Sequence, residues 1–200
     1  DLFNMKLNYN TPSSNGGVAQ FNGNISEIQW LSVGQGIQSY GYTYDPMNRL
    51  FEAKYYDLVR SVNNGRYNEK IGTPTGSEPA YDLNGNIRRL TRYGKKMENG
   101  YGLMDDLTYT YTGNQMTRVD DGIAKNDFEE GFKENIKTAN EYTYDWNGNM
   151  LKDSNKGITS IAYNYLNLPA QVNKSSTEYV VYIYDATGRK LAQQVYGTTM

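Results

Sequence analysis

The feature that most restricts the fold of this chain is a short segment that recurs along it. Each copy begins with Tyr followed by Asp or Asn, and the fourth residue after that Tyr is Gly or Asn in all five copies. The copies begin at Tyr44-Asp45, Tyr81-Asp82, Tyr144-Asp145, Tyr163-Asn164 and Tyr184-Asp185. Their Gly or Asn positions are Asn48, Gly85, Gly148, Asn167 and Gly188, and two weaker copies place Gly23 and Gly113 in the same role. A local rule kept at so many sites indicates that one structural unit is repeated.

The spacing within each copy predicts a β-hairpin loop with one residue in the left-handed backbone region. A type I turn followed by a G1 bulge requires such a residue. Gly adopts that region freely, and Asn tolerates it better than most residues do. The Asp or Asn that starts the turn is expected to accept a hydrogen bond from the backbone amide two residues later. The recurring segment therefore contains the residues that a hairpin turn requires.

The residues that lead into these turns alternate in the manner of half-buried strands. Tyr40, Tyr42 and Tyr44 lie two apart in the sequence, so their side chains are expected to share one face. The last three turn positions are spaced by 19 and 21 residues, and about 20 residues accommodate two typical strands with their turns. The repeating unit is therefore expected to be a hairpin.

These observations predict an all-β fold: a repetitive antiparallel β-hairpin strip that forms an open or curled sheet, with residues 1–200 as a single repeat region. Insertions at 52–80, 92–106 and 120–140 lengthen the unit and are expected to be loops or extended hairpins. Residues 127–133 are expected to form a helical turn. Because the chain begins without Met or a signal peptide, we interpret it as a fragment of a larger protein.

Composition argues against several classes of function. The 20 basic and 22 acidic residues give a net charge of −2, which provides no field for attracting nucleic acid. The chain has neither Cys nor His, so thiolate metal sites, Ser-His-Asp catalysis and the usual zinc ligand sets are excluded. Adjacent carboxylates such as Asp105 and Asp106 would point to opposite faces of a strand. We therefore expect no enzyme activity and no catalytic, cofactor or metal site.

Aromatic residues are the remaining candidates for contact with a ligand. The chain contains 20 tyrosines and two tryptophans, and exposed aromatic rings stack on the C–H faces of sugars. Trp146 lies within a predicted turn and is expected to be exposed, and Trp30 is the second candidate. The alternative is that the tyrosines form the core itself, because tyrosine buries a large apolar body while keeping a polar tip.

Residues 142–150, Tyr-Thr-Tyr-Asp-Trp-Asn-Gly-Asn-Met, and the related segment 182–191 resemble the YD repeats of the RHS family. The resemblance extends from about residue 20 to the end of the sequence, and residues 163–169 resemble RHS proteins of Bacteroides-type bacteria. It implies a long β-strip that spirals into a hollow shell, which in bacterial members encloses a C-terminal toxin. It also implies an extracellular or cell-surface, wall-associated location. Neither the Asp-Pro-rich core motif of the family nor a toxin domain is recognisable, so the resemblance does not extend to self-cleavage or toxicity.

Two functions therefore remain open from the sequence. The first is a structural segment of an RHS/YD-repeat cell-surface protein, part of the wall of a β-shell, with the rest of the parent protein and its toxin as partners. The alternative is a carbohydrate-binding or adhesive module at the bacterial surface, with glycans as ligands. Because a strip of this kind leaves unpaired strand edges, self-association through those edges is also expected.

Overall fold

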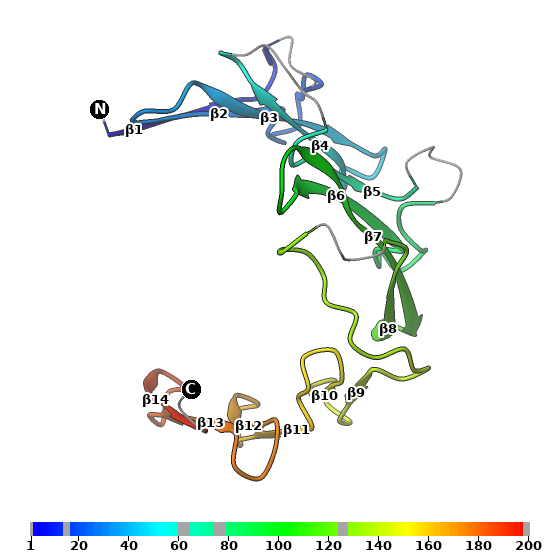
Figure 1. Cartoon of the computed structure of the whole chain (residues 1–200), viewed down its shortest axis with the longest axis vertical. Helices are drawn as coiled ribbons and strands as arrows, with labels where there is room; N and C mark the ends of the chain where they lie inside the picture. Colours follow the sequence, from blue (N-terminus) through cyan, green and yellow to red (C-terminus); the bar gives the residue numbers. More distant parts are fainter. Residues whose placement is uncertain (1, 14–16, 60–64, 74–78, 124–127, 198–200) are drawn as a thin grey trace. The chain divides into compact units, whose positions relative to one another are not determined.

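The computed structural model of the chain describes residues 2–13, 17–59, 65–73, 79–123 and 128–197 (Figure 1). Within these ranges the regular secondary structure consists of β-strands alone, which confirms the all-β prediction. The strands are β1 (Phe3–Asn8), β2 (Glu27–Ser32), β3 (Gln38–Tyr44), β4 (Leu50–Asp57), β5 (Glu69–Ile71), β6 (Arg89–Lys95), β7 (Tyr101–Thr112), β8 (Gln115–Asp121), β9 (Tyr142–Tyr144), β10 (Met150–Asp153), β11 (Ser160–Tyr163), β12 (Pro169–Asn173), β13 (Tyr179–Tyr184) and β14 (Lys190–Tyr196).

The strands form three sheets in which each strand pairs with its neighbours in the sequence. Strands β1 to β8 form one sheet in that order, β9 pairs with β10, and β11 to β14 form a third sheet in that order. Every pairing with a defined register is antiparallel. Because each series is linear, these sheets do not close, which confirms the prediction of an open antiparallel sheet.

The chain divides into two compact units that share the hairpin of β7 and β8. The first contains residues 1–108 and 121–132, and the second contains residues 109–120 and 133–200. Two of the predicted insertions contribute strands to the first unit: 52–80 contains most of β4 and all of β5, and 92–106 contains most of the hairpin between β6 and β7. These insertions are therefore extended hairpins in part.

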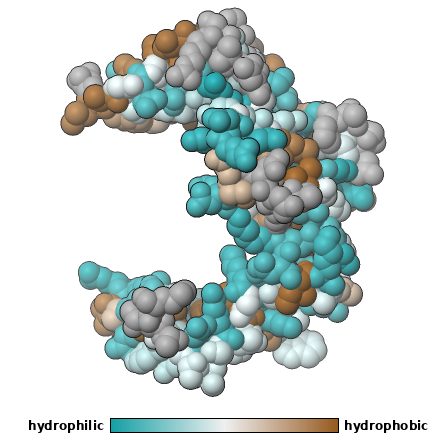
Figure 2. Space-filling model, viewed as in Figure 1, coloured by the Kyte–Doolittle hydropathy of each residue, from teal (hydrophilic) through white to brown (hydrophobic). Residues whose placement is uncertain are grey.

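Aromatic rings of neighbouring strands pack together in the first unit, whereas hydrophilic residues cover much of the face of the molecule drawn in Figure 2. Tyr40 of β3 lies opposite Tyr55 of β4, their ring centroids are 5.6 Å apart, and Tyr55 is buried. Trp30 of β2 stacks on Tyr40 at 5.8 Å. Cross-strand aromatic pairs of this kind stabilise a sheet beyond their buried area. Of these three rings Tyr55 is buried, and Trp30 and Tyr40 are half-buried against it.

The expected helical turn is absent from residues 128–133, because a buried polar side chain from another part of the chain binds the backbone there. Residues 129–131 form a bend, residues 128, 132 and 133 are irregular, and Asp127 lies outside the described residues. The carboxylate of Asp105, fully buried, accepts a hydrogen bond from the backbone amide of Phe132 at 2.7 Å and pairs with Arg92 at 2.6 Å. Because that amide is used by Asp105 and Gly131 has a φ of 107°, the helical prediction was wrong for residues 128–133.

Candidate functional site

The recurring segment forms the same turn in each copy. The residue four positions after the motif Tyr has a positive φ throughout, as the spacing predicts. The values are 62° for Asn48, 88° for Gly85, 84° for Gly148, 57° for Asn167 and 86° for Gly188, and the weaker copies have 92° at Gly23 and 60° at Gly113. In the hairpin of β13 and β14 the register shifts between Ile183 and Tyr184, which is the irregularity that a bulge next to such a turn produces.

The Asp or Asn at the start of each turn accepts two backbone hydrogen bonds with one oxygen. Oδ1 of Asp145 accepts from the amide of Asn147 at 2.9 Å, as expected, and also from the amide of Asn149 at 2.8 Å. The same pair of bonds, to the amides two and four residues later, is made by Asp45, Asp82, Asn164 and Asp185. The second bond was missed from the sequence, although the constant spacing of the turn was a signal for it.

These hydrogen bonds also affect the acidity of the turn carboxylates. The side-chain amide of Asn149 donates to Oδ2 of Asp145 at 2.9 Å. Together with the backbone amides, this bond holds the pKa of Asp145 below its usual value. The pKa of Asp82 is lowered in the same way by Asn86, and that of Asp185 by Thr187 and the amide of Arg189. Each of these carboxylates therefore accepts its hydrogen bonds from residues of its own turn.

The hydroxyl of each motif tyrosine connects one repeat to the preceding one. Tyr163 donates to the carbonyl oxygen of Met150 at 2.7 Å, and Met150 lies two residues after Gly148 of the preceding turn. The same spacing joins Tyr44 to Ile25, Tyr81 to Leu50 and Tyr184 to Pro169. Tyr144 donates to the carbonyl oxygen of Met116, which lies three residues after Gly113 of the weaker copy. Burial raises the pKa of Tyr44, Tyr81, Tyr144 and Tyr163. These hydroxyls are therefore neutral donors to the backbone of the neighbouring repeat.

Successive turns also contact one another through their side chains. In the second unit, Nδ2 of Asn147 and Nδ2 of Asn149 each lie 3.2 Å from Oδ1 of Asn167. In the first unit, Nδ2 of Asn22 donates to Oδ1 of Asn48 at 2.6 Å. The motif residues thus use their polar groups within the turn and between adjacent turns.

The structure places the two candidate tryptophans in different environments. Trp146 is fully exposed at the tip of its turn, with a relative exposure of 105%. Tyr165 occupies the same position in the next turn, two residues after its motif tyrosine, and has a relative exposure of 80%. Trp30 is instead half-buried and packs against Tyr40 and Tyr55. Of the two predicted contact residues, Trp146 is therefore the more exposed.

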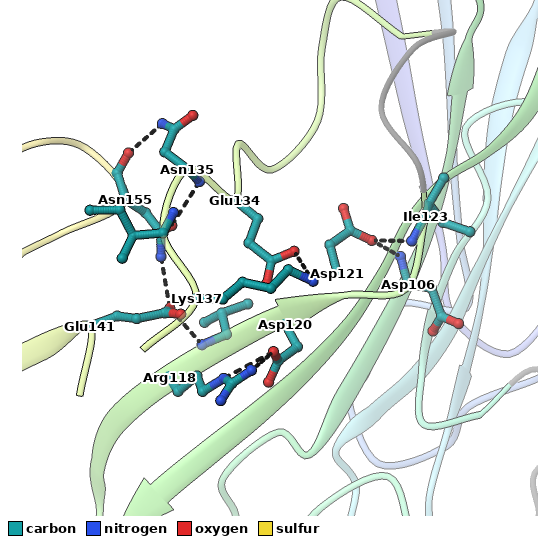
Figure 3. Close-up of polar contacts among 12 residues, drawn as sticks. Asp106, Arg118, Asp120, Asp121, Ile123, Glu134, Asn135, Lys137, Glu141 and Asn155 are labelled. Atoms are coloured by element: carbon teal, nitrogen blue, oxygen red, sulfur yellow. Dashed lines mark hydrogen bonds and ion pairs between the residues drawn. The ribbon is translucent and has the colours of Figure 1, made fainter. Parts of the chain in front are cut away.

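Each unit contains a buried glutamate that holds loop segments together. In the second unit, Oε2 of Glu141 accepts from the amide of Val119 at 3.1 Å and from Nδ2 of Asn155 at 2.7 Å (Figure 3). Oδ1 of Asn155 in turn accepts from the amide of Asn135 at 3.0 Å. The buried pair of Glu141 and Asn155 therefore holds the insertion that precedes β9 in place. Neither glutamate was identified from the sequence, because no local pattern marks its acceptors and donors.

Glu27 has the corresponding role in the first unit. It accepts from the backbone amide of Ser13 at 2.9 Å, from the Ser13 hydroxyl and from Nδ2 of Asn8 at 2.7 Å. Burial alone would raise its pKa, but the bonds from Ser13 and Asn8 outweigh burial and hold the pKa below its usual value. These carboxylates therefore stabilise the connections between strands.

The carboxylates that adjoin in the sequence are used separately in the fold. Asp105 pairs with Arg92, whereas Asp106 pairs with Arg89 at 2.5 Å. Among the described residues there is no group of three or more acidic side chains arranged to hold a metal ion. Within those same ranges no helix has the length and apolar character needed to cross a membrane. In comparisons with known proteins, no family model and no curated protein matches this chain.

Proposed function

We propose that this chain is a structural segment of an RHS/YD-repeat cell-surface protein, part of the wall of a β-shell, with no chemistry of its own. The observation that carries the proposal is the hydrogen bond from each motif tyrosine to the backbone of the preceding repeat, made by Tyr44, Tyr81, Tyr144, Tyr163 and Tyr184. A motif whose groups bind the neighbouring copy extends a strip by one hairpin at a time.

The energetics of the motif favour an architectural role. Each of these hydrogen bonds is partly buried, and an intramolecular hydrogen bond contributes about 0.5–1.5 kcal/mol to stability. The Asp or Asn of the same copy satisfies two backbone amides within the turn, for example those of Asn147 and Asn149. Stability in such an array is approximately the sum of the stability of each repeat and the coupling between neighbours. Repetition of the motif therefore produces a continuous wall.

The test is hydrogen exchange in the Tyr184→Phe variant. Loss of the bond to the carbonyl of Pro169 should increase deuterium uptake in residues 160–173 as well as in residues 179–196. Tyr182→Phe, on the same strand, is the matched control and should leave residues 160–173 unchanged. If Tyr184→Phe changes exchange only in its own hairpin, the motif does not couple repeats and the proposal fails.

The exposed rings of Trp146 and Tyr165 favour carbohydrate binding as a second candidate function. They occupy the same position in consecutive turns, and those turns are joined by the hydrogen bond between Asn147 and Asn167. An array of neutral and acidic glycans tests this candidate. Saturable binding that is lost in Trp146→Ala and weakened in Tyr165→Ala would support it. Leu83→Ala is the control, because Leu83 is the equivalent exposed residue of an earlier turn. Absence of binding to every glycan would rule out this candidate and favour the structural role.

A further inference from the structure

One pair of tyrosines in the second unit lies outside the recurring motif. Tyr179 begins β13 and Tyr196 ends β14, and the two residues are direct cross-strand partners. Their ring centroids are 4.5 Å apart and their planes differ by 16°. The two rings are therefore stacked face to face across the hairpin.

This pair has no part in the connection between repeats. Along β13, Val180, Tyr182 and Tyr184 share one face, and the alternation of a strand places Tyr179 on the other. The hydroxyl of Tyr184 binds the carbonyl of the preceding repeat, whereas that of Tyr196 donates to Oε1 of Gln194, on the same strand, at 3.0 Å. Neither the turn motif nor the alternation of the strands requires a tyrosine at position 179 or at position 196.

The short distance between its rings distinguishes this pair from the other tyrosine contacts among the described residues. Tyr40 and Tyr42 are also stacked, with planes that differ by 18°, but their centroids are 6.2 Å apart. Tyr55 and Tyr67 meet edge to face at 5.4 Å, and Tyr67 meets Tyr101 edge to face at 5.3 Å. Tyr55 is buried, whereas Tyr196 has a relative exposure of 43% and Tyr179 is half-buried. An oxidant in solution therefore has access to one ring of a parallel pair.

We propose that Tyr179 and Tyr196 form a site of oxidative modification at which hydrogen peroxide, with a haem peroxidase, produces an intramolecular dityrosine. Each phenol loses one electron and one proton, which gives two phenoxyl radicals. The radicals couple through the ring carbons next to the hydroxyl groups, and the two hydrogens on those carbons move to the oxygens as the rings become aromatic again. One C–C bond forms, two C–H bonds break, and one hydrogen peroxide is reduced to two molecules of water.

The geometry makes this coupling intramolecular. Because the rings are nearly parallel and close, a small rotation of the side chains brings the two reacting carbons together. The product is a covalent bond between the first residue of β13 and the last residue of β14. It closes the open end of this hairpin and fixes the strand at the end of the four-stranded sheet.

The test is treatment of the dilute folded chain with horseradish peroxidase and hydrogen peroxide, followed by trypsin and mass spectrometry. Cleavage separates residues 175–189, which contain Tyr179, Tyr182 and Tyr184, from residues 191–200, which contain only Tyr196. The expected product joins these two peptides with the loss of two hydrogen atoms, and fragmentation places the link at Tyr179. A mixture of unlabelled and ¹⁵N-labelled chains should give no mixed-isotope product.

Two variants and the unfolded chain complete the experiment. Tyr196→Phe keeps the ring, so circular dichroism should be unchanged, and the linked peptide should be lost. Tyr182→Phe should retain the link, and oxidation in urea should remove its preference for Tyr179. A link at Tyr182 or Tyr184, a mixed-isotope product, or no link in the folded chain would each overturn the proposal.

Discussion

Gly148 allows the backbone requirement of the turn to be measured separately from packing. Its φ is 84°, and a Cβ placed on it would meet no atom within 4 Å, so Gly148→Ala adds backbone strain without a clash. The left-handed region costs an L-residue about 1–2 kcal/mol. The lower conformational entropy of Ala in the unfolded chain offsets roughly 0.4–1 kcal/mol of this cost. We expect a net loss of about 1 kcal/mol, which for a chain of this size lowers Tm by roughly 2–4 °C.

The assay is thermal and urea unfolding followed by far-UV circular dichroism. Gly148→Asn is the matched control, because Asn occupies the equivalent position with φ 62° at Asn48 and 57° at Asn167, and it should lose much less stability than Gly148→Ala. Asn167→Ala should lose at least as much stability as Gly148→Ala, because it also removes the oxygen that accepts from Asn147 and Asn149. If Gly148→Ala unfolds at the wild-type temperature, or if Asn is as costly as Ala, the left-handed conformation is not what selects Gly and Asn at these positions.

Three further predictions concern the hydrogen bonds and the sheet edges. Tyr163→Phe removes the donor to the carbonyl of Met150 and should cost about 1 kcal/mol in urea unfolding, whereas Tyr165→Phe, on an exposed ring, should cost nothing measurable. The pKa of Asp145 is lower in the folded chain than in the unfolded chain. The ionised carboxylate therefore contributes fully to folding stability above the unfolded pKa, and this contribution is lost as the pH falls through the folded pKa. Asp145→Asn should therefore unfold more easily than wild type near neutral pH, and the difference should disappear in acid, between roughly pH 5 and pH 2; a constant difference would contradict this. Finally, the unpaired edges of the open sheets predict reversible self-association, so the mass measured by sedimentation equilibrium should rise with concentration, and a constant monomer mass would refute it.

The turn was predictable from the sequence because its conformation depends on only five consecutive residues. The Gly or Asn requirement at position 148 follows from the steric limits of an L-residue, which hold in any context. The acceptor role of Asp145 toward the amide of residue 147 is equally local. The period-two alternation in β3 and β13 similarly identified the shared faces, because alternation is a property of a single strand.

Contacts between residues far apart in the chain were harder to predict from the sequence. The acceptor of the Tyr163 hydroxyl lies 13 residues away, and that of Tyr144 lies 28 residues away across an insertion. The helical turn expected at 127–133 is absent from residues 128–133 for the same reason, because Asp105, distant in the sequence, accepts the hydrogen bond of the Phe132 amide. Local composition cannot show that a remote carboxylate will compete for a backbone group.

It was therefore possible to predict from the sequence where the chain turns, which residues enter each turn with alternating faces, and that the fold is an open antiparallel β-structure. The structure was needed to show what the motif tyrosines bind, that Trp30 packs against Tyr40 and Tyr55, and how Glu27 and Glu141 are buried. The physical reason is the range of the interactions involved. Backbone sterics act within a turn, whereas the burial of a carboxylate or a hydroxyl is favourable only when folding brings its distant donors and acceptors to it.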